Sequence, residues 1–345
     1  MRIERKQARR IAIVGAMLAL IWIGLWFRLL YIERPYFHPD EFISMVIAKT
    51  VAEHGVPVLP SGLWYDPEIA FSYFSGLFVW LLGASSFAVR WAGVFFGVLS
   101  IPMAYVTARR ILSSPSAGIA AATFLAVAPE AVLWGGRARR YSMGEFLILL
   151  MLLLIWLGAV EGDRRRYRLF FYGACVVAGL TFLQALVVIP PLFLAVVLLA
   201  WRRYTTKEAI RGSILTKESA VEAALIVLTL ACFYFRAKSN YIAPEAEMRA
   251  AERFQEGGVS SFSKSVAVLN PFLLPTFDLP YALSRLRGLL VLEPLYQLLA
   301  VAALLAIILS LVPSFDRTGK FRRAAWFLLI IAGGVMFEFL FGPPS

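Results

Sequence analysis

Residues 11–31 read IAIVGAMLALIWIGLWFRLLY, a mostly apolar block between two polar segments. A helix of about 20 apolar residues is long enough to cross the hydrocarbon core of a bilayer. The block is too long for the core of a signal peptide, and no small-residue cleavage site follows it. We therefore expect a retained membrane span with its N-terminus in the cytoplasm, because basic residues crowd the segment before it: Arg2, Arg5, Lys6, Arg9 and Arg10.

The composition extends this interpretation to the whole chain. Of its 345 residues, 60% are hydrophobic and the mean hydropathy is +0.74, whereas soluble domains are about half apolar. The net charge of +12 does not indicate nucleic-acid binding, because many of the cations stand in short clusters between apolar blocks, as in cytoplasmic loops. Cys175 and Cys232 lie in apolar blocks without metal-ligand spacing. The further basic clusters lie at 109–110, 164–168, 202–217 and 317–323.

The basic clusters also set the topology, because an even number of crossings must separate two cytoplasmic clusters. Two apolar blocks, Ile69–Leu82 and Phe87–Ala108, lie between the first span and Arg109, but only one can cross. Ile69–Leu82 is the shorter, so we expect a juxtamembrane or re-entrant helix there, on the outer side. The sequence predicts an all-α polytopic protein with about nine spans. The remaining spans are expected at Ala117–Trp134, Met143–Leu157, two within Leu169–Ala200 that part at Pro190 and Pro191, Val221–Phe235, Leu289–Leu311 and Ala324–Leu340.

The first outer segment opens with a pair of adjacent carboxylates. His38-Pro39-Asp40-Glu41 precedes a stretch of helical character, Phe42–Glu53. An aspartate at a helix start is often only an N-cap, and Glu41 would then be a first-turn anion. The alternative is that Asp40 is a general base, since a carboxylate can take a proton from a hydroxyl within about 3 Å. His38 could assist such a base or simply be exposed.

Two more carboxylates follow on the same outer segment, in Trp64-Tyr65-Asp66-Pro67-Glu68. Asp66 before a proline is as consistent with a cap or turn as with a functional acid. We regard Asp66, Glu68 and His38 as candidate substrate-binding residues, with both interpretations of the acids open.

A basic turn follows the third span, Gly135-Gly136-Arg137-Ala138-Arg139-Arg140-Tyr141-Ser142. Parity places it on the outer side, against the usual bias of positive charge. The arginines could be a solvated turn or could reach lipid headgroups. Alternatively Arg137, Arg139 and Arg140 bind a phosphate, because guanidinium groups form bidentate bonds with phosphate oxygens. Tyr141 is expected to add a hydrogen bond or an aromatic surface.

Taken in order, these segments resemble the GT-C superfamily of glycosyltransferases, in particular its dolichyl-phosphate-mannose-protein mannosyltransferase-like branch, which includes the lipid A aminoarabinose transferases. The resemblance covers residues 10–160, and beyond them it rests on hydropathy. It is carried by His38-Pro39-Asp40-Glu41, Asp66-Pro67 with Tyr73 and Trp80, Leu81 through Arg90, and Arg137 through Ser142.

The resemblance implies a polyprenyl-phosphate sugar donor and a membrane-embedded active site on the outer face. It implies Asp40 as catalytic base, Glu41 in support and Asp66 as a second functional acid. The aminoarabinose transferases have a lysine where this chain has Pro67, and often an aspartate where it has Arg140-Tyr141, so the donor and acceptor identities do not transfer.

The resemblance also suggests how the chain is organised. Residues 1–235 would be a GT-C-like transmembrane module that includes the first outer loop, 32–86. Residues 236–288 would be a second outer loop, and 289–345 a set of C-terminal spans. Most members are longer, so we expect either a truncated product or a short form that works with a partner.

The sequence therefore predicts a membrane glycosyltransferase that moves a sugar from a polyprenyl-phosphate donor to a hydroxyl, with inversion at the anomeric carbon. The acceptor would be a lipid, a protein or a glycan, with membrane lipids as further partners and no nucleic acid. No His/Cys cluster indicates a metal, although Asp-rich loops leave a divalent cation open. The alternatives are a flippase or transporter of polyprenyl-linked sugars, and a non-catalytic partner subunit of a glycosyltransferase complex.

Overall fold

The computed structural model describes residues 2–32, 39–59, 62, 64–65, 68–161 and 164–181, with single positions at 189, 192, 224, 227 and 231. Every named helix lies in the first of two compact units, Met1–Ala185 and Leu186–Ser345. The spans expected beyond residue 181 and the 236–288 loop fall outside the described residues, apart from those single positions. The count of nine spans and the three-part organisation therefore remain predictions.

The described residues are helical, which confirms the predicted all-α class for this part of the chain. Two extended residues, Val58 and Trp64, form an isolated antiparallel bridge, and the described part contains no sheet. The helices are α1 (Arg2–Ile32), α2 (Pro39–His54), α3 (Ile69–Leu82), α4 (Ser86–Leu112), α5 (Pro115–Val127), α6 (Pro129–Gly135), α7 (Tyr141–Ile155) with a π-helical turn η1 (Trp156–Val160), and α8 (Arg165–Thr181).

Three described helices are long and apolar enough to cross a membrane, and the bent pair α5–α6 would make a fourth. The three are Gln7–Ile32 in α1, Ser86–Leu112 in α4 and Tyr141–Val160 in α7. Each contains the span predicted for it. Helix α3 has the predicted bounds and only 14 residues, which is short for a crossing.

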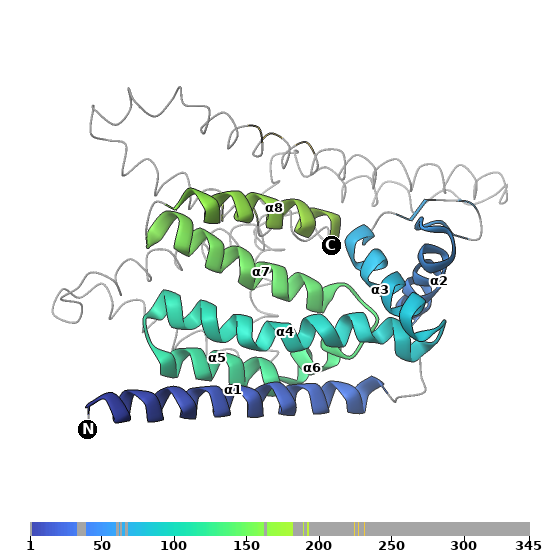
Figure 1. Cartoon of the computed structure of the whole chain (residues 1–345). Coiled ribbons are helices and arrows are strands. Elements are labelled where there is room, and N and C mark those ends of the chain that lie inside the picture. The colour runs from blue at the N-terminus through green and yellow to red at the C-terminus, as the bar shows by residue number, and fades with distance from the viewer. Residues whose placement is uncertain are drawn as a thin grey trace, which may run out of the picture. The chain divides into compact units, whose positions relative to one another are not determined.

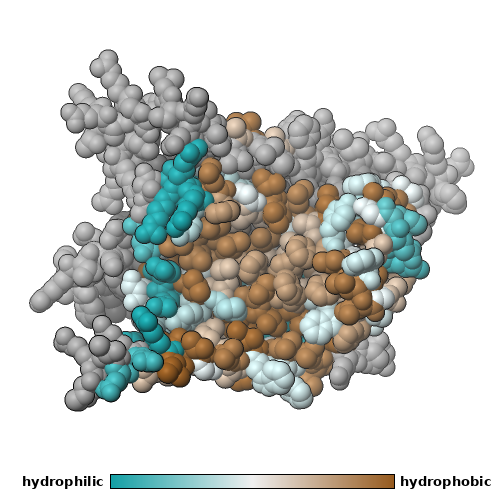
Figure 2. Space-filling view, in the orientation of Figure 1, coloured by the Kyte–Doolittle hydropathy of each residue, from teal (hydrophilic) through white to brown (hydrophobic). Residues whose placement is uncertain are grey.

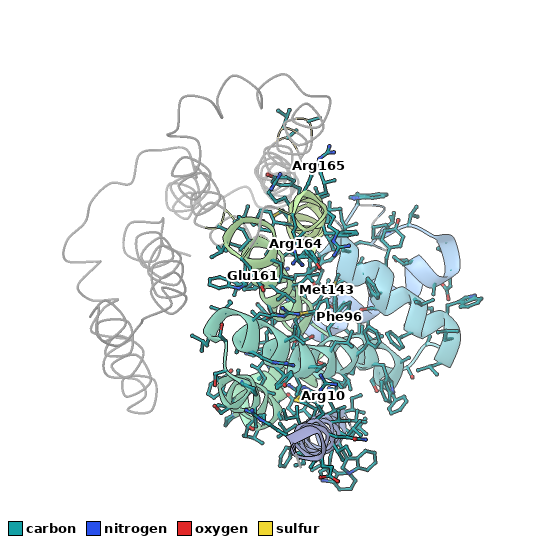
Figure 3. All side chains as sticks on the ribbon, turned by 60° about the vertical axis from the view of Figure 1, so that its left-hand side comes forward. Arg10, Phe96, Met143, Glu161, Arg164 and Arg165 are labelled. Carbon is teal, nitrogen blue, oxygen red and sulfur yellow. The ribbon has the colours of Figure 1, made fainter. Side chains whose placement is uncertain are left out.

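Successive long helices run in alternating directions, as the charge parity predicts (Figure 1). The N-terminus of α1, the end of α4 and the end of α7 lie at one end of the bundle, and α2, α3 and α6 lie toward the other (Figure 1). At the first end Arg110 forms an ion pair of 3.5 Å with Glu161. A hydrophilic band marks that end in Figure 2, and Figure 3 turns it forward to show Arg10, Glu161, Arg164 and Arg165.

The predicted single span Ala117–Trp134 is wrong in one respect, because it is broken between α5 and α6. The two helices meet at an angle of 60°. Pro129 begins α6, and Ala128 before it has an extended backbone with ψ of 126°. Proline has no N–H for the helical hydrogen bond and disfavours the α conformation in the residue before it. Apolar composition alone does not detect this break.

Helix α4 is the centre of the first unit. Its residues Ile101 and Tyr105 form a buried cluster with Ala122 and Ala126 of α5, against which apolar side chains of α1 pack. Toward its other end α4 lies directly against the basic turn, because a Cβ at Gly93 would collide with the carbonyl oxygen of Arg137. Small residues let helical backbones approach this closely in membrane proteins.

Gly93→Ala is therefore expected to destabilise the protein by about 1–3 kcal/mol, since overpacking must displace the backbone of the turn. The matched control is Gly15→Ala in α1, where an added Cβ meets nothing within 4 Å. Alanine favours the helix over glycine, so the control should unfold at the same temperature or higher. Thermal unfolding in detergent checks this, and equal behaviour of the two variants would contradict the close contact.

Candidate functional site

The first outer segment and the basic turn meet through the carboxylate of Glu41. This side chain in the first turn of α2 is 1% exposed. Its Oε1 and Oε2 accept hydrogen bonds from Nε and Nη2 of Arg90 at 3.1 and 3.3 Å. Its Oε1 also accepts a hydrogen bond of 2.9 Å from the backbone N–H of Ala138, 97 residues away. Arg90 donates a further bond of 3.0 Å to the carbonyl of Ile32 at the end of α1. One buried ion pair thus joins α1, α2, α4 and the turn.

A second carboxylate, Glu68, lies just before α3 and faces the arginines of the turn. It is fully buried. Its Oε1 is 3.6 Å from Nη1 of Arg139, and its Oε2 is 3.7 Å from Nη1 of Arg140. These separations are within the range of an ion pair and are longer than an ordinary hydrogen bond between the same atoms.

Two hydroxyls complete the surroundings of Glu68. Ser44 of α2 donates a bond of 2.7 Å to Oε1, and the hydroxyl of Tyr65 donates a longer one of 3.4 Å to the same atom. Burial, followed by the negative charge of Glu68, raises the pKa of Tyr65 well above its usual value. Tyr65 therefore keeps its proton at neutral pH and acts as a donor to the carboxylate.

The third arginine of the turn has a different environment. Arg137 donates from Nε to the hydroxyl of Tyr31 at 2.9 Å, and its guanidinium lies 4.8 Å from the ring centre of Trp134. The rings of Trp134 and Tyr141 are 4.4 Å apart. The guanidinium groups of Arg139 and Arg140 are 5.9 and 5.8 Å from the Tyr141 ring. Tyr141 therefore stands between the aromatic side of the turn and the side that faces Glu68.

Residues 66–234 match the family described as dolichyl-phosphate-mannose-protein mannosyltransferase. The chain is related to the GT-C glycosyltransferases. The match includes Glu68, Arg90 and the basic turn, whereas Asp40 and Glu41 precede it. The predicted resemblance to this superfamily is thereby confirmed.

Among curated proteins, this GT-C relative is similar to the undecaprenyl phosphate-alpha-4-amino-4-deoxy-L-arabinose arabinosyl transferase of Yersinia enterocolitica serotype O:8. The identity is 26% over 148 residues, which are 42% of this chain and 25% of that protein. Among solved structures it is similar to the oligosaccharyltransferase of Archaeoglobus fulgidus in complex with Zn and sulfate, with 15% identity and a TM-score of 0.46. That alignment covers 94% of this chain and 48% of the archaeal one. The chain thus spans a quarter of the length of the Yersinia protein and about half of the length of the archaeal one.

The structure brings together only some of the candidate residues. Glu41, Glu68, Arg139 and Arg140 share one cluster, and Arg137 with Tyr141 lies beside it. The backbone of Asp40 lies in the first turn of α2, one residue before Glu41 and so about 3.8 Å from it between Cα atoms. His38 and Asp66 lie outside the described residues.

Three residues of the cluster were not among the candidate site residues: Ser44, Tyr65, and Arg90, which entered only as the end of the stretch that carries the family resemblance. Arg90 did carry a signal, because it is the only charged residue in the block Phe87–Ala108. A charge inside an apolar span is costly and therefore implies a partner. Among the side chains that the structure describes, no group of three or more His, Cys, Asp or Glu could hold a metal ion. The divalent cation remains an untested prediction.

Proposed function

We propose that this GT-C relative is an integral membrane glycosyltransferase that transfers a sugar from a polyprenyl-phosphate donor to an acceptor hydroxyl. Its N-terminus would lie in the cytoplasm and its active site at the outer face. The observation that carries the proposal is the junction of the acidic and basic segments, in which Glu68 faces Arg139 and Arg140 and Glu41 bonds to Ala138. Acidic and cationic groups thus converge at one end of the bundle.

This junction suits an inverting transfer in a single displacement. Asp40 accepts the proton of the acceptor hydroxyl as its oxygen attacks the anomeric carbon. The bond between that carbon and the phosphate oxygen breaks with oxocarbenium character. The electron pair stays on the polyprenyl phosphate, which leaves as an anion and needs no general acid. Arg139 and Arg140 stabilise that anion through charge-assisted hydrogen bonds.

Glu68 and Glu41 would act as positioning residues in this scheme. Glu68 holds the guanidinium groups of Arg139 and Arg140 by charge, at 3.6 and 3.7 Å. Nε of Arg140 is buried and has no hydrogen-bond partner among the described residues. Glu41 fixes the start of α2, and with it Asp40, against the basic turn. Arg137 and Tyr141 would supply the adjoining aromatic surface.

The alternative of a flippase would need ionisable residues along a pathway within the spans. Away from the basic clusters at their ends, the three described spans contain three acidic or basic side chains: Glu145 of α7, and Arg28 and Arg90, which are buried and hydrogen-bonded to groups of neighbouring helices. No observation on the described residues favours transport over transfer.

Removing the turn cations should weaken donor binding. Arg139→Gln and Arg140→Gln are each expected to raise the KM for the donor about 10- to 100-fold, since a hydrogen bond to a charged group contributes about 1.5–3 kcal/mol. Arg140→Lys should recover part of the loss, because it keeps the charge but not the planar fork of donors. Initial rates of polyprenyl-phosphate release in nanodiscs measure both effects.

The matched control is Arg110→Gln, which removes an exposed arginine with an acidic partner at the opposite end of the bundle. It should leave the KM unchanged. Thermal unfolding of each variant separates lost binding from lost folding. An unchanged KM in both folded turn variants would rule out the proposed phosphate site.

A further inference from the structure

We infer that Arg28 is a positioning residue, which replaces the helical hydrogen bond that Pro129 removes and so holds the bend that carries the basic turn to the site. The effect of Arg28 on activity rests on the proposed function, whereas its effect on the bend does not. Its structural content concerns α1, α5 and α6.

The first step is the burial of Arg28 within an apolar helix. Its side chain is fully buried, although it lies inside the span Gln7–Ile32. A guanidinium in such a place is costly unless its donors find partners, and here both terminal nitrogens do, whereas Nε has none among the described residues. Nη1 donates to the carbonyl of Gly24 at 2.9 Å, one turn earlier in α1. Nη2 donates to the carbonyls of Leu125 at 3.0 Å and Ala131 at 3.2 Å.

The second step is the position of those last two carbonyls on either side of the bend. Leu125 lies four residues before Pro129, so its carbonyl is the one that would accept a helical hydrogen bond from residue 129. Proline has no N–H to donate. Ala131 lies in α6, beyond the break. One nitrogen of Arg28 thus supplies the missing donor on α5 and at the same time ties α5 to α6 across the 60° bend.

The third step is the space reserved for the guanidinium. A Cβ at Gly97 of α4 would lie 2.6 Å from Nε of Arg28, and a Cβ at Gly135 of α6 would collide with the same atom. A Cβ at Gly136 would lie 2.7 Å from Cβ of Tyr31 in α1. The side chain of Arg28 therefore occupies a slot that only glycines leave open, at the residues where α6 ends and the basic turn begins.

The consequence concerns the two turn arginines that face Glu68. Only a few residues separate Gly135 from Arg139 and Arg140, so the direction of α6 sets where those side chains can reach. By holding the bend in place, Arg28 would pre-organise the phosphate site without contacting the sugar donor. A 1 Å displacement of such a group is enough to weaken catalysis strongly.

A double-mutant cycle tests the link between Arg28 and Pro129. Arg28→Met should lower the Tm by roughly 5 °C or more, because it leaves the part-buried carbonyl of Leu125 without a donor and cuts the tie to Ala131. In the Pro129→Ala background Leu125 gains a backbone donor, so the same substitution should lower the Tm by less than half as much. Additive Tm shifts would overturn the inference, since independent sites add. If Arg28→Met does not fold, recovery of a folded Arg28→Met/Pro129→Ala protein supports the inference and its failure to fold overturns it.

A distance measurement tests the positioning role apart from activity. Spin labels replace Phe42 of α2 and Tyr141, which are 56% and 37% exposed, in a background with Cys175→Ala and Cys232→Ala. Arg28→Met should shift or broaden the label distance, whereas Trp26→Met, on the exposed side of α1, should not. An unchanged distance in folded Arg28→Met would overturn the inference.

The same variants separate this inference from the proposed function. With unlabelled protein, Arg28→Met should raise the KM for a polyprenyl-phosphate sugar more than tenfold relative to Trp26→Met. If the wild-type protein shows no transfer, the proposed function fails while the Tm cycle and the label distance still decide the role of Arg28. If transfer is present but Arg28→Met keeps the wild-type KM and label distance, only the inference fails.

Discussion

Asp40→Asn is expected to lower kcat about 10²- to 10⁴-fold, the range that a general base contributes. Asparagine keeps the size of the side chain and removes its charge. It cannot accept the proton of the attacking hydroxyl. The KM for the donor should change little, because the phosphate is held by the turn arginines. Rates with saturating donor in nanodiscs, together with the Tm, measure the two effects.

The matched control for this variant lies on the same helix. Glu53→Gln near the end of α2 removes an exposed carboxylate that is 3.8 Å from Lys49. Exposed pairs of this kind contribute little, so its kcat and Tm should equal those of the wild type. An Asp40→Asn protein with wild-type kcat would show that Asp40 is only an anion in the first turn of α2.

The positions of the long helices could be predicted from hydropathy and charge, because both are properties of composition along the chain. Block lengths and basic clusters were sufficient to place α1, α4 and α7 and to separate the short helix α3 from the crossings. The bend at Pro129 was missed, although the residue is visible in the sequence. Hydropathy treats Ala117–Trp134 as one apolar run and does not register the loss of a single backbone donor.

The sequence indicated which residue types form the candidate site, but not which of these residues contact one another. The acidic segment and the basic turn could each be identified as unusual for their positions. Which carboxylate meets which arginine depends on how α2 and α3 pack on α4, and a single sequence carries no such information. Glu41 therefore looked like a helper of Asp40, whereas its carboxylate is bonded to Arg90 and to the backbone of Ala138. A lone charge in an apolar block, such as Arg90 or Arg28, was the available signal for both buried clusters.

The buried pair Glu41–Arg90 should be the most sensitive point of the fold. Removing one partner leaves an uncompensated buried charge, so Glu41→Gln and Arg90→Met are each expected to cost about 3–5 kcal/mol. Both residues are 1% exposed and their charged groups are 3.1 Å apart. Thermal unfolding in detergent measures the loss. The control, Arg110→Met, breaks an exposed pair of 3.5 Å with Glu161 and should cost less than about 1 kcal/mol.

The double variant Glu41→Met/Arg90→Met separates stability from positioning. Replacing both members of a buried pair by apolar residues of similar volume is often close to neutral. The double variant should therefore recover much of the Tm that either single variant loses. It should not recover the activity, because the N–H of Ala138 loses the carboxylate that docks the basic turn against α2. A double variant that recovered both Tm and kcat would show that Glu41 stabilises the bundle without placing Asp40 against the phosphate site. Recovery of the Tm alone would show that the contact between α2 and the turn, rather than overall stability, is what transfer requires.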